Sequence, residues 1–209
     1  MRNDYSRRQA FNADNNRLLI YASDGSWHLY DANTHTHIRE LPGVGGDAEP
    51  QWHPTDPKIL YYIPSAGIGM KLYRLYVEAG VSSVAADFGA RLKALWPAAN
   101  AAWSGSEGSP SRDARYWAFV VDDADYNALG LFTLDLQTDT IITTYDLKSN
   151  GKGEPDHISM SPLGNYVVVS WEKGDGGPTA YTRDFANPVQ VDTESNHSDL
   201  ALLENGEEV

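Results

Sequence analysis

The stretch SMSPLGNYVVVSW, residues 159–171, contains the features that decide the fold. A polar turn at 161–165 supplies the Pro, Gly and Asn that tight connections require. The run from Tyr166 to Trp171 is rich in β-branched and aromatic residues, as strands are. The stretch therefore predicts a turn that leads directly into a β-strand.

The same turn-and-strand pattern occurs at earlier places in the chain. Strand-like runs at 18–22, 59–63 and 116–121 follow polar turns at 12–17, 53–58 and 111–115. In each unit a second run and a more polar third run come next, and a short segment ahead of the first run would supply another strand. Four antiparallel strands in each repeat are typical of a propeller blade.

The spacing of the repeats supports this interpretation. When the units are aligned on their turns, equivalent positions lie 41, 58, 50 and 42 residues apart, and periods of about 40–50 residues match propeller blades. The longest interval holds an insert at about 89–106, with a short helix expected at 90–96. A β-sandwich is the alternative fold, but it does not explain repeated copies of one pattern.

The sequence therefore predicts an all-β protein with one β-propeller domain that covers residues 1–209. We expect about four four-stranded antiparallel blades, followed by the start of a fifth. ENGEEV at 204–209 resembles the turn before a further strand, and since propellers have about 4–8 blades, we expect this to be an incomplete larger propeller. A closed four-bladed ring with one additional strand is the alternative. The expected blades lie at approximately 6–45, 46–102, 103–152, 153–195 and, in part, 196–209.

Charge and composition limit the classes of partner. The chain has 29 Asp and Glu against 16 Lys and Arg, a formal net charge of −13, which repels nucleic-acid phosphates. A local basic pocket could still accept a small anion.

There is no Cys, so disulfides and thiolate sites are excluded. We expect no membrane insertion, because no apolar run approaches the roughly 20 residues of a membrane span, and MRNDYSRRQA at the start does not read as a signal peptide.

The aligned repeats also point to a site. Innermost strands line the central channel of a propeller, so equivalent positions converge near one mouth of that channel. Ionisable groups placed in this way shift one another's pKa values and hold protons or cations. The ring could bind a divalent metal, a sugar acid or a peptide terminus, and the alternative is a wet channel lined by polar residues. Its expected members are Arg8, Glu49, Glu107, His157 and Asp199, with His197 close by.

The tryptophans divide into two groups. Trp96 and Trp103 lie in the insert, where they could stack on a sugar ring over the channel mouth or fix the insert to its blade. Trp52, Trp117 and Trp171 lie within predicted strands, so we expect them in the core.

Two further clusters favour a structural interpretation. Asp122, Asp123 and Asp125 could gather Ca²⁺, but they lack the Gly and the closing Glu of an EF-hand loop, and a solvated hairpin loop is expected. His35 and His37 would share one face of a strand, as some metal ligands do, but that strand is expected at the outer edge of a blade.

SMSPLGNYVVVSW and LFTLDLQTDT, residues 131–140, resemble the TolB-type or WD40-like bacterial propeller repeats. The resemblance covers nearly the whole chain, although HPTDP at 53–57 and SRDAR at 111–115 lack the Ser-Pro-Asp-Gly core of the repeat. Relatives of this architecture include TolB, oligogalacturonate and ulvan lyases, and propeller domains of serine peptidases. No catalytic motif of these proteins matches residue by residue, and the chain contains no G-x-S-x-G elbow, P-loop or H-E-x-x-H.

Three functions follow as expectations. The first is a ligand-binding propeller of the bacterial envelope or exterior, periplasmic or secreted, with a carbohydrate or peptide at the channel mouth. The second is a polysaccharide lyase on acidic sugars, in which Arg8 neutralises the sugar carboxylate and His157 or His197 removes the α-proton. The third is a TolB-like scaffold that binds proteins through its outer loops.

Overall fold

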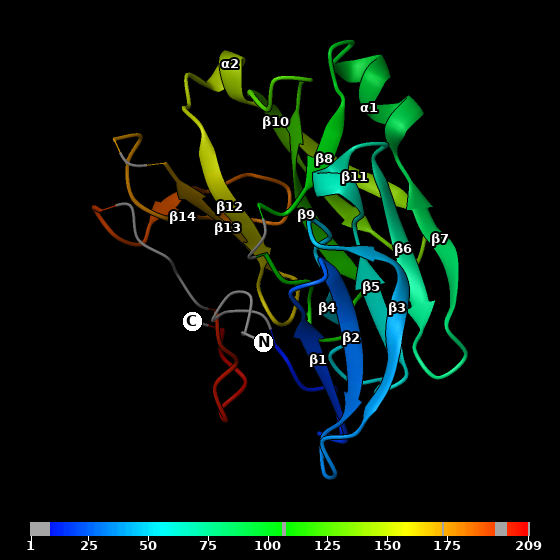
Figure 1. The fold of residues 1–209 in the computed structure, drawn as a ribbon. Helices are drawn as coiled ribbons and strands as arrows, with labels where there is room; N and C mark the ends of the chain where they lie inside the picture. Colours follow the sequence, from blue (N-terminus) through cyan, green and yellow to red (C-terminus); the bar gives the residue numbers. More distant parts are fainter. Residues whose placement is uncertain (1–8, 106–107, 173, 195–199, 209) are drawn as a thin grey trace.

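A computed structural model describes residues 9–105, 108–172, 174–194 and 200–208 (Figure 1). Its backbone forms four antiparallel sheets that follow one another along the chain as the blades of a propeller. Within each blade the strands are adjacent in sequence order. The predicted all-β propeller is therefore confirmed.

The blades have the following strands. The first contains β1 (Arg17–Tyr21), β2 (Ser26–Asp31) and β3 (His37–Gly45). The second contains β4 (Gln51–Trp52), β5 (Ile59–Tyr62), β6 (Lys71–Tyr76) and β7 (Val81–Asp87). The third contains β8 (Ala101–Trp103), β9 (Tyr116–Asp122), β10 (Ala128–Asp135) and β11 (Thr140–Asp146). The fourth contains β12 (Pro155–Met160), β13 (Tyr166–Trp171), β14 (Thr179–Thr182) and β15 (Val189–Gln190).

Three short helical segments connect these strands: the 3₁₀ turn η1 (Ser65–Gly67), α1 (Gly89–Leu95) and α2 (Leu147–Asn150). The helix α1 confirms the one expected in the insert. No helix of the described part of the chain is long and apolar enough to cross a membrane.

One turn recurs at the end of every inner segment. The backbone N–H of the residue that opens the turn donates a hydrogen bond of 2.8–3.2 Å to the carbonyl of the residue that closes it. The pairs are Asn12–Arg17, His53–Ile59, Ser111–Tyr116, Ser161–Tyr166 and Leu203–Glu207. In two copies the serine Oγ also accepts the N–H of the first strand residue, Tyr116 at 2.9 Å and Tyr166 at 3.0 Å. These local bonds explain why the polar turn signals could be aligned in the sequence.

The core lies between neighbouring blades. The second and third blades are joined by a cluster that includes Phe88, Phe119 and Phe132, whose ring centroids are 5.0–5.3 Å apart. The third and fourth blades enclose Trp171, which is fully buried, together with neighbours such as Ile158. Since burying each large apolar side chain is worth roughly 1.5–3 kcal/mol, blade-on-blade packing dominates the stability of the fold. Trp52, Trp117 and Trp171 are buried, as expected.

Two inner strands differ from expectation. Strand β8 lies inside the stretch expected as an insert, because Ala101 and Ala102 pair with the end of β9 and are fully buried. Alanine is a weak strand former, which conceals this strand in the sequence. In the first blade, the described residues supply only an isolated bridge, Phe11 to Leu18, where an inner strand was expected.

Candidate functional site

The structure describes two members of the predicted ring. Glu49 lies two residues before β4, and His157 lies on β12. The other predicted members, Arg8, Glu107, His197 and Asp199, lie outside the described residues. Whether all six form one ring therefore stays a prediction.

Glu49 connects the second blade to the third. Its side chain is buried, with 2% of the residue exposed. Its Oε2 accepts hydrogen bonds from the backbone N–H of Ser104 at 2.8 Å and from the Ser104 hydroxyl at 3.1 Å. A buried carboxylate needs such donors, so Glu49 fixes the segment that follows β8.

His157 lies on the other side of that segment. Its Nε2 is 3.1 Å from the Ser170 hydroxyl and its Nδ1 is 3.2 Å from Oδ2 of Asp156. Gly105 packs directly against the backbone of Asp156 and His157, at a φ of +75°, and a Cβ there would overlap both residues. Glu49 and His157 thus hold one short segment between them, and this segment forms part of the wall of a pocket.

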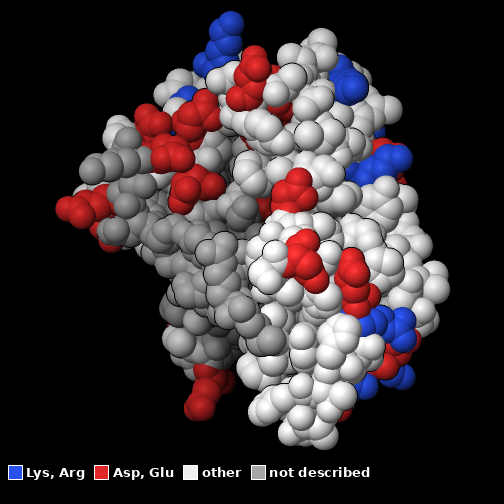
Figure 2. Space-filling model, in the orientation of Figure 1, with Lys and Arg blue, Asp and Glu red and all other residues white. Residues whose placement is uncertain are grey.

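That pocket, called here the mouth pocket, has a volume of about 470 Å³. It lies between the third and fourth blades, next to β8 and to the start of β12. Figure 2 shows Asp and Glu side chains gathered over the region below α2 where β12 begins. The side chains that define the pocket are Trp103, Asp122, Tyr126, Glu154, Asp156 and Glu172.

Two aromatic rings form one wall of the mouth pocket. The rings of Trp103 and Tyr126 meet edge to face, with centroids 6.0 Å apart. Tyr126 is 44% exposed, and the hairpin loop that carries it is held by Asp123, whose Oδ1 accepts the N–H groups of Asp125 and Asn127 at 2.9 and 3.0 Å. Fixed loops of this kind present an aromatic side chain without further loss of conformational freedom.

Carboxylates also line the mouth pocket. Asp122 is buried, and its Oδ2 accepts the indole N–H of Trp103 at 2.5 Å. Burial raises the pKa of Asp122 to about 6, against the effect of that hydrogen bond, and the nearby charges of Glu154 and Glu49 raise it further. Glu154 is oriented by the N–H of Ala128, which donates to its Oε2 at 3.0 Å.

Trp96 and Trp103, grouped together in the sequence, have separate roles. The indole N–H of Trp96 donates to Oδ2 of Asp146 at 3.0 Å, which attaches the end of α1 to the start of α2. Trp103 instead lines the mouth pocket. Of the two alternatives considered for the pair, Trp96 fixes the insert and Trp103 faces a cavity.

The structure also shows where the residues of the acidic cluster and of the histidine cluster lie. Asp122 is buried at the end of β9, whereas Asp123 organises the hairpin loop. His37 starts the outer strand β3, as expected, and its Nε2 lies 3.0 Å from Nδ1 of His28. His35 precedes that strand, at a φ of +56°, so the two histidines do not share a strand face as predicted. In the part of the chain that the structure describes, no three His, Asp or Glu side chains are grouped to hold a metal ion.

Sequence reasoning missed Tyr126, Glu154 and Glu172 as pocket residues. Glu154 lies three positions before the predicted His157, and Tyr126 follows the predicted acidic cluster, so both are close to residues that the sequence did indicate. Their convergence depends on how the third blade packs against the fourth, which no local pattern encodes.

Solved structures with the same architecture cover most of this chain. TolB from Acinetobacter baumannii matches with a TM-score of 0.59 at 20% identity, over 83% of this chain and 40% of that one. Oligogalacturonate lyase from Vibrio parahaemolyticus matches with a TM-score of 0.64 at 14% identity, over 90% and 52%. A β-propeller domain from Myceliophteria thermophila matches with a TM-score of 0.56 at 16% identity, over 99% and 61%.

The chain therefore spans about 40–61% of the length of these structures. No protein-family model matches the sequence, and no curated protein matches it. Likeness at this level of identity establishes architecture, so the chain is a β-propeller of the kind found in TolB and in oligogalacturonate lyase.

Proposed function

We propose that this chain forms a ligand-binding propeller and that the mouth pocket takes a carbohydrate. The observation that supports this most is the pairing of Trp103 and Tyr126 with the carboxylates of Asp122, Glu154 and Asp156 in one cavity. A sugar ring has apolar C–H faces that can stack on aromatic side chains. Its hydroxyl groups donate hydrogen bonds to carboxylate oxygens, which are strong acceptors.

The charge of the pocket favours one class of sugar. Its lining includes four carboxylic side chains and no Lys or Arg among the described residues. An acidic sugar would be repelled by these groups, whereas a neutral sugar or an amino sugar would not. A peptide ligand is the other candidate, and its amino terminus would suit the same carboxylates.

The predicted ring belongs to this proposal. Arg8, Glu107, His197 and Asp199 are proposed to face the same mouth of the channel as Glu49 and His157, and a divalent metal held there would be found by elemental analysis. A lyase acting on acidic sugars is the enzyme alternative, suggested by the likeness to oligogalacturonate lyase. His157, its candidate base, is only 2% exposed and has both ring nitrogens near Asp156 or Ser170, so binding is favoured over this chemistry.

We further propose that the protein acts in the bacterial envelope or outside the cell, periplasmic or secreted. The support is the resemblance to TolB-type repeats. Cell fractionation of the natural host, followed by immunodetection, tests this, and recovery of the protein only in the cytoplasm contradicts it.

Affinity measurements with oligosaccharides test the proposed function. Isothermal titration calorimetry with neutral, amino and acidic oligosaccharides should show binding of neutral or amino members and none of the acidic ones. Tyr126→Ala should then weaken binding about 5- to 30-fold, because stacking on an aromatic ring is worth on the order of 1–2 kcal/mol.

Tyr166→Ala is the matched control, since Tyr166 is 45% exposed against 44% for Tyr126 but does not line the pocket. Equal loss of affinity in both variants would contradict the proposed site. Binding of acidic oligosaccharides with formation of an ultraviolet-absorbing unsaturated product would instead support the lyase. If no sugar binds and the chain instead binds a protein partner, the result would support the TolB-like scaffold.

A further inference from the structure

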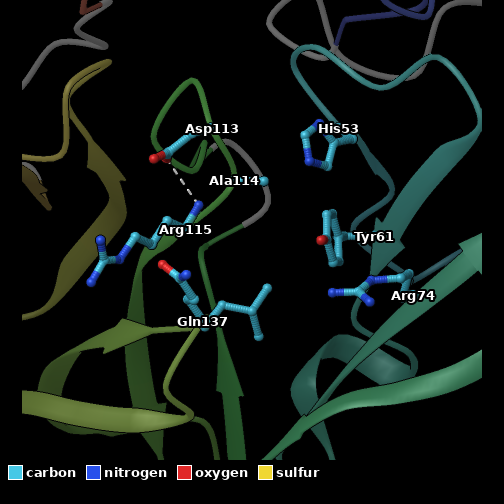
Figure 3. Close-up of a pocket in the computed structure, with 8 residues that line it drawn as sticks. His53, Tyr61, Arg74, Asp113, Ala114, Arg115 and Gln137 are labelled. Carbon is cyan, nitrogen blue, oxygen red and sulfur yellow. Dashed lines mark hydrogen bonds between the residues drawn. The ribbon is translucent and has the colours of Figure 1, made fainter.

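A second pocket lies between the second and third blades, at the opposite end of the inner strands from the mouth pocket. Its volume is about 330 Å³. His53 and Asp113 come from the turns that follow the inner segments, whereas the mouth pocket lies where β12 begins. Figure 3 shows two facing walls: His53, Tyr61 and Arg74 on one side, and Asp113, Arg115 and Gln137 on the other.

Arg74 provides a positive charge that forms no ion pair with any residue the structure describes. Its guanidinium lies over the ring of Tyr61, 5.5 Å from the centroid. Its Nε is buried and has no hydrogen-bond partner. The ion pairs among the described residues involve other cations, such as Arg17 with Glu78 and Arg115 with Asp135. Because Arg74 lines the pocket while its Nε is buried, a ligand in the pocket would reach the guanidinium through its terminal Nη groups.

His53 adds a second donor to the same wall. Its Nδ1 accepts the backbone N–H groups of Thr55 and Asp56, at 3.2 and 3.0 Å. Burial lowers the pKa of His53, and the charge of Arg74 lowers it further, whereas Asp56 and Asp113 act in the opposite direction. The ring is therefore neutral at pH 7, and because Nδ1 accepts, the proton is on Nε2.

The facing wall carries a negative charge. Oδ1 of Asp113 accepts the Ser111 hydroxyl at 2.6 Å and the backbone N–H of Arg115 at 3.1 Å. Although burial raises the pKa of Asp113, these hydrogen bonds hold it below its usual value, so the carboxylate is ionised. Arg115 does not neutralise the pocket, since its side chain is engaged by Asp135 at 2.7–3.1 Å.

From this arrangement we propose that the second pocket binds a free α-amino acid. The carboxylate accepts from the Arg74 guanidinium and from Nε2 of His53, and the ammonium group faces Asp113. A dianion such as phosphate is disfavoured by Asp113, and a simple cation by Arg74. The side chain of Leu136, with the backbone of Ala114, gives the remaining surface for the ligand's own side chain. This site is independent of the proposed carbohydrate site.

The signal of the Arg74 side chain gives a direct test. In ¹H–¹⁵N NMR spectra, the Arg74 Nε–Hε resonance should shift saturably with at least one of the twenty free L-amino acids. The N-acetyl derivative and the methyl ester of the best ligand each lack one of its two charges, so both should bind at least about tenfold more weakly. Absence of a saturable shift with any amino acid up to about 10 mM, a limit equivalent to roughly −3 kcal/mol, would overturn the proposal.

Matched variants locate the site. Arg74→Gln should lower the affinity at least about tenfold, since a charge-assisted hydrogen bond is lost. Arg112→Gln removes the same charge from an exposed residue of the neighbouring turn that does not line the pocket, and should change the affinity less than about twofold.

Asp113→Asn covers the case in which Arg74→Gln fails to fold. Asparagine keeps an oxygen for Ser111 and for the N–H of Arg115, so only the charge is lost. We expect a loss of at least about tenfold for the amino acid and little change for its N-acetyl derivative. Equal affinity of wild type and Asp113→Asn for the amino acid would contradict the proposed orientation.

Discussion

At the scale of single residues, Asp122 shows how the fold prepares the mouth pocket. It ends β9, pairs with Ala101 of β8 and is buried. Its carboxyl group has a pKa of about 6, raised mainly by burial, and it accepts the indole N–H of Trp103. Asp122 therefore fixes Trp103 in the pocket, and its burial lowers the stability of the folded protein at pH values where the carboxyl group is ionised.

Replacement of Asp122 by Asn should stabilise the protein at neutral pH. The folded-state pKa is raised, so protonated Asp122 contributes stability that is complete below about pH 4 and is lost as pH rises through about 6. Asn keeps an acceptor for Trp103 but has no charge. At pH 7.5 we expect a gain of about 3 kcal/mol in the free energy of unfolding, since the pKa is raised from 3.8 to about 6 and one pKa unit corresponds to roughly 1.4 kcal/mol.

Urea denaturation of both proteins at pH 4 and pH 7.5 provides the measurement. The difference between them should shrink to near zero at pH 4. Asp125→Asn is the control, because it removes the same charge from the exposed hairpin loop. An equal gain at both pH values would mean that the charge of Asp122 is not the cause.

At the scale of elements, Trp96 joins the insert to the third blade. Its ring lies against Gly130 of β10, where a Cβ would overlap it. Its N–H donates to Asp146, which also accepts the N–H of Ser149 as the N-cap of α2. One carboxylate thus fixes the ends of two helices.

Trp96→Phe should keep most of the packing and remove this one hydrogen bond. We expect a loss of about 1 kcal/mol in the free energy of unfolding. The pKa of Asp146, held at about 2 by Ser149 and then by Trp96, should rise toward its usual value. Carbon-detected NMR titration of the Asp146 carboxyl group measures this, and an unchanged pKa would contradict the assigned role of Trp96.

The elements that could be predicted are those whose signals are local. Tyr166 to Trp171 form a strand with the expected bounds, and α1 falls within one residue of its expected start. Strand β8 could not be predicted, because Ala101 and Ala102 form a strand only through pairing with β9. Tyr126 and Glu154 share a pocket through blade packing, which is a non-local property of the chain.

At the scale of the whole molecule, the two pockets differ in charge and lie at opposite ends of the inner strands. The chain has a net charge of −13, and the mouth pocket lies beneath the carboxylates gathered in Figure 2. Such a field repels polyanions and tolerates neutral or cationic ligands. The second pocket, in contrast, is lined by Arg74, which forms no ion pair with the described residues.

The proposed carbohydrate site places the ligand against Trp103 in the mouth pocket. The most direct measurement is the indole ¹H–¹⁵N resonance of Trp103, assigned with Trp103→Phe, during titration with an oligosaccharide that binds. We predict a saturable shift of this resonance with the same dissociation constant as calorimetry, and no comparable shift for buried Trp171. A ligand that saturates the protein while the Trp103 resonance stays unchanged would contradict the account.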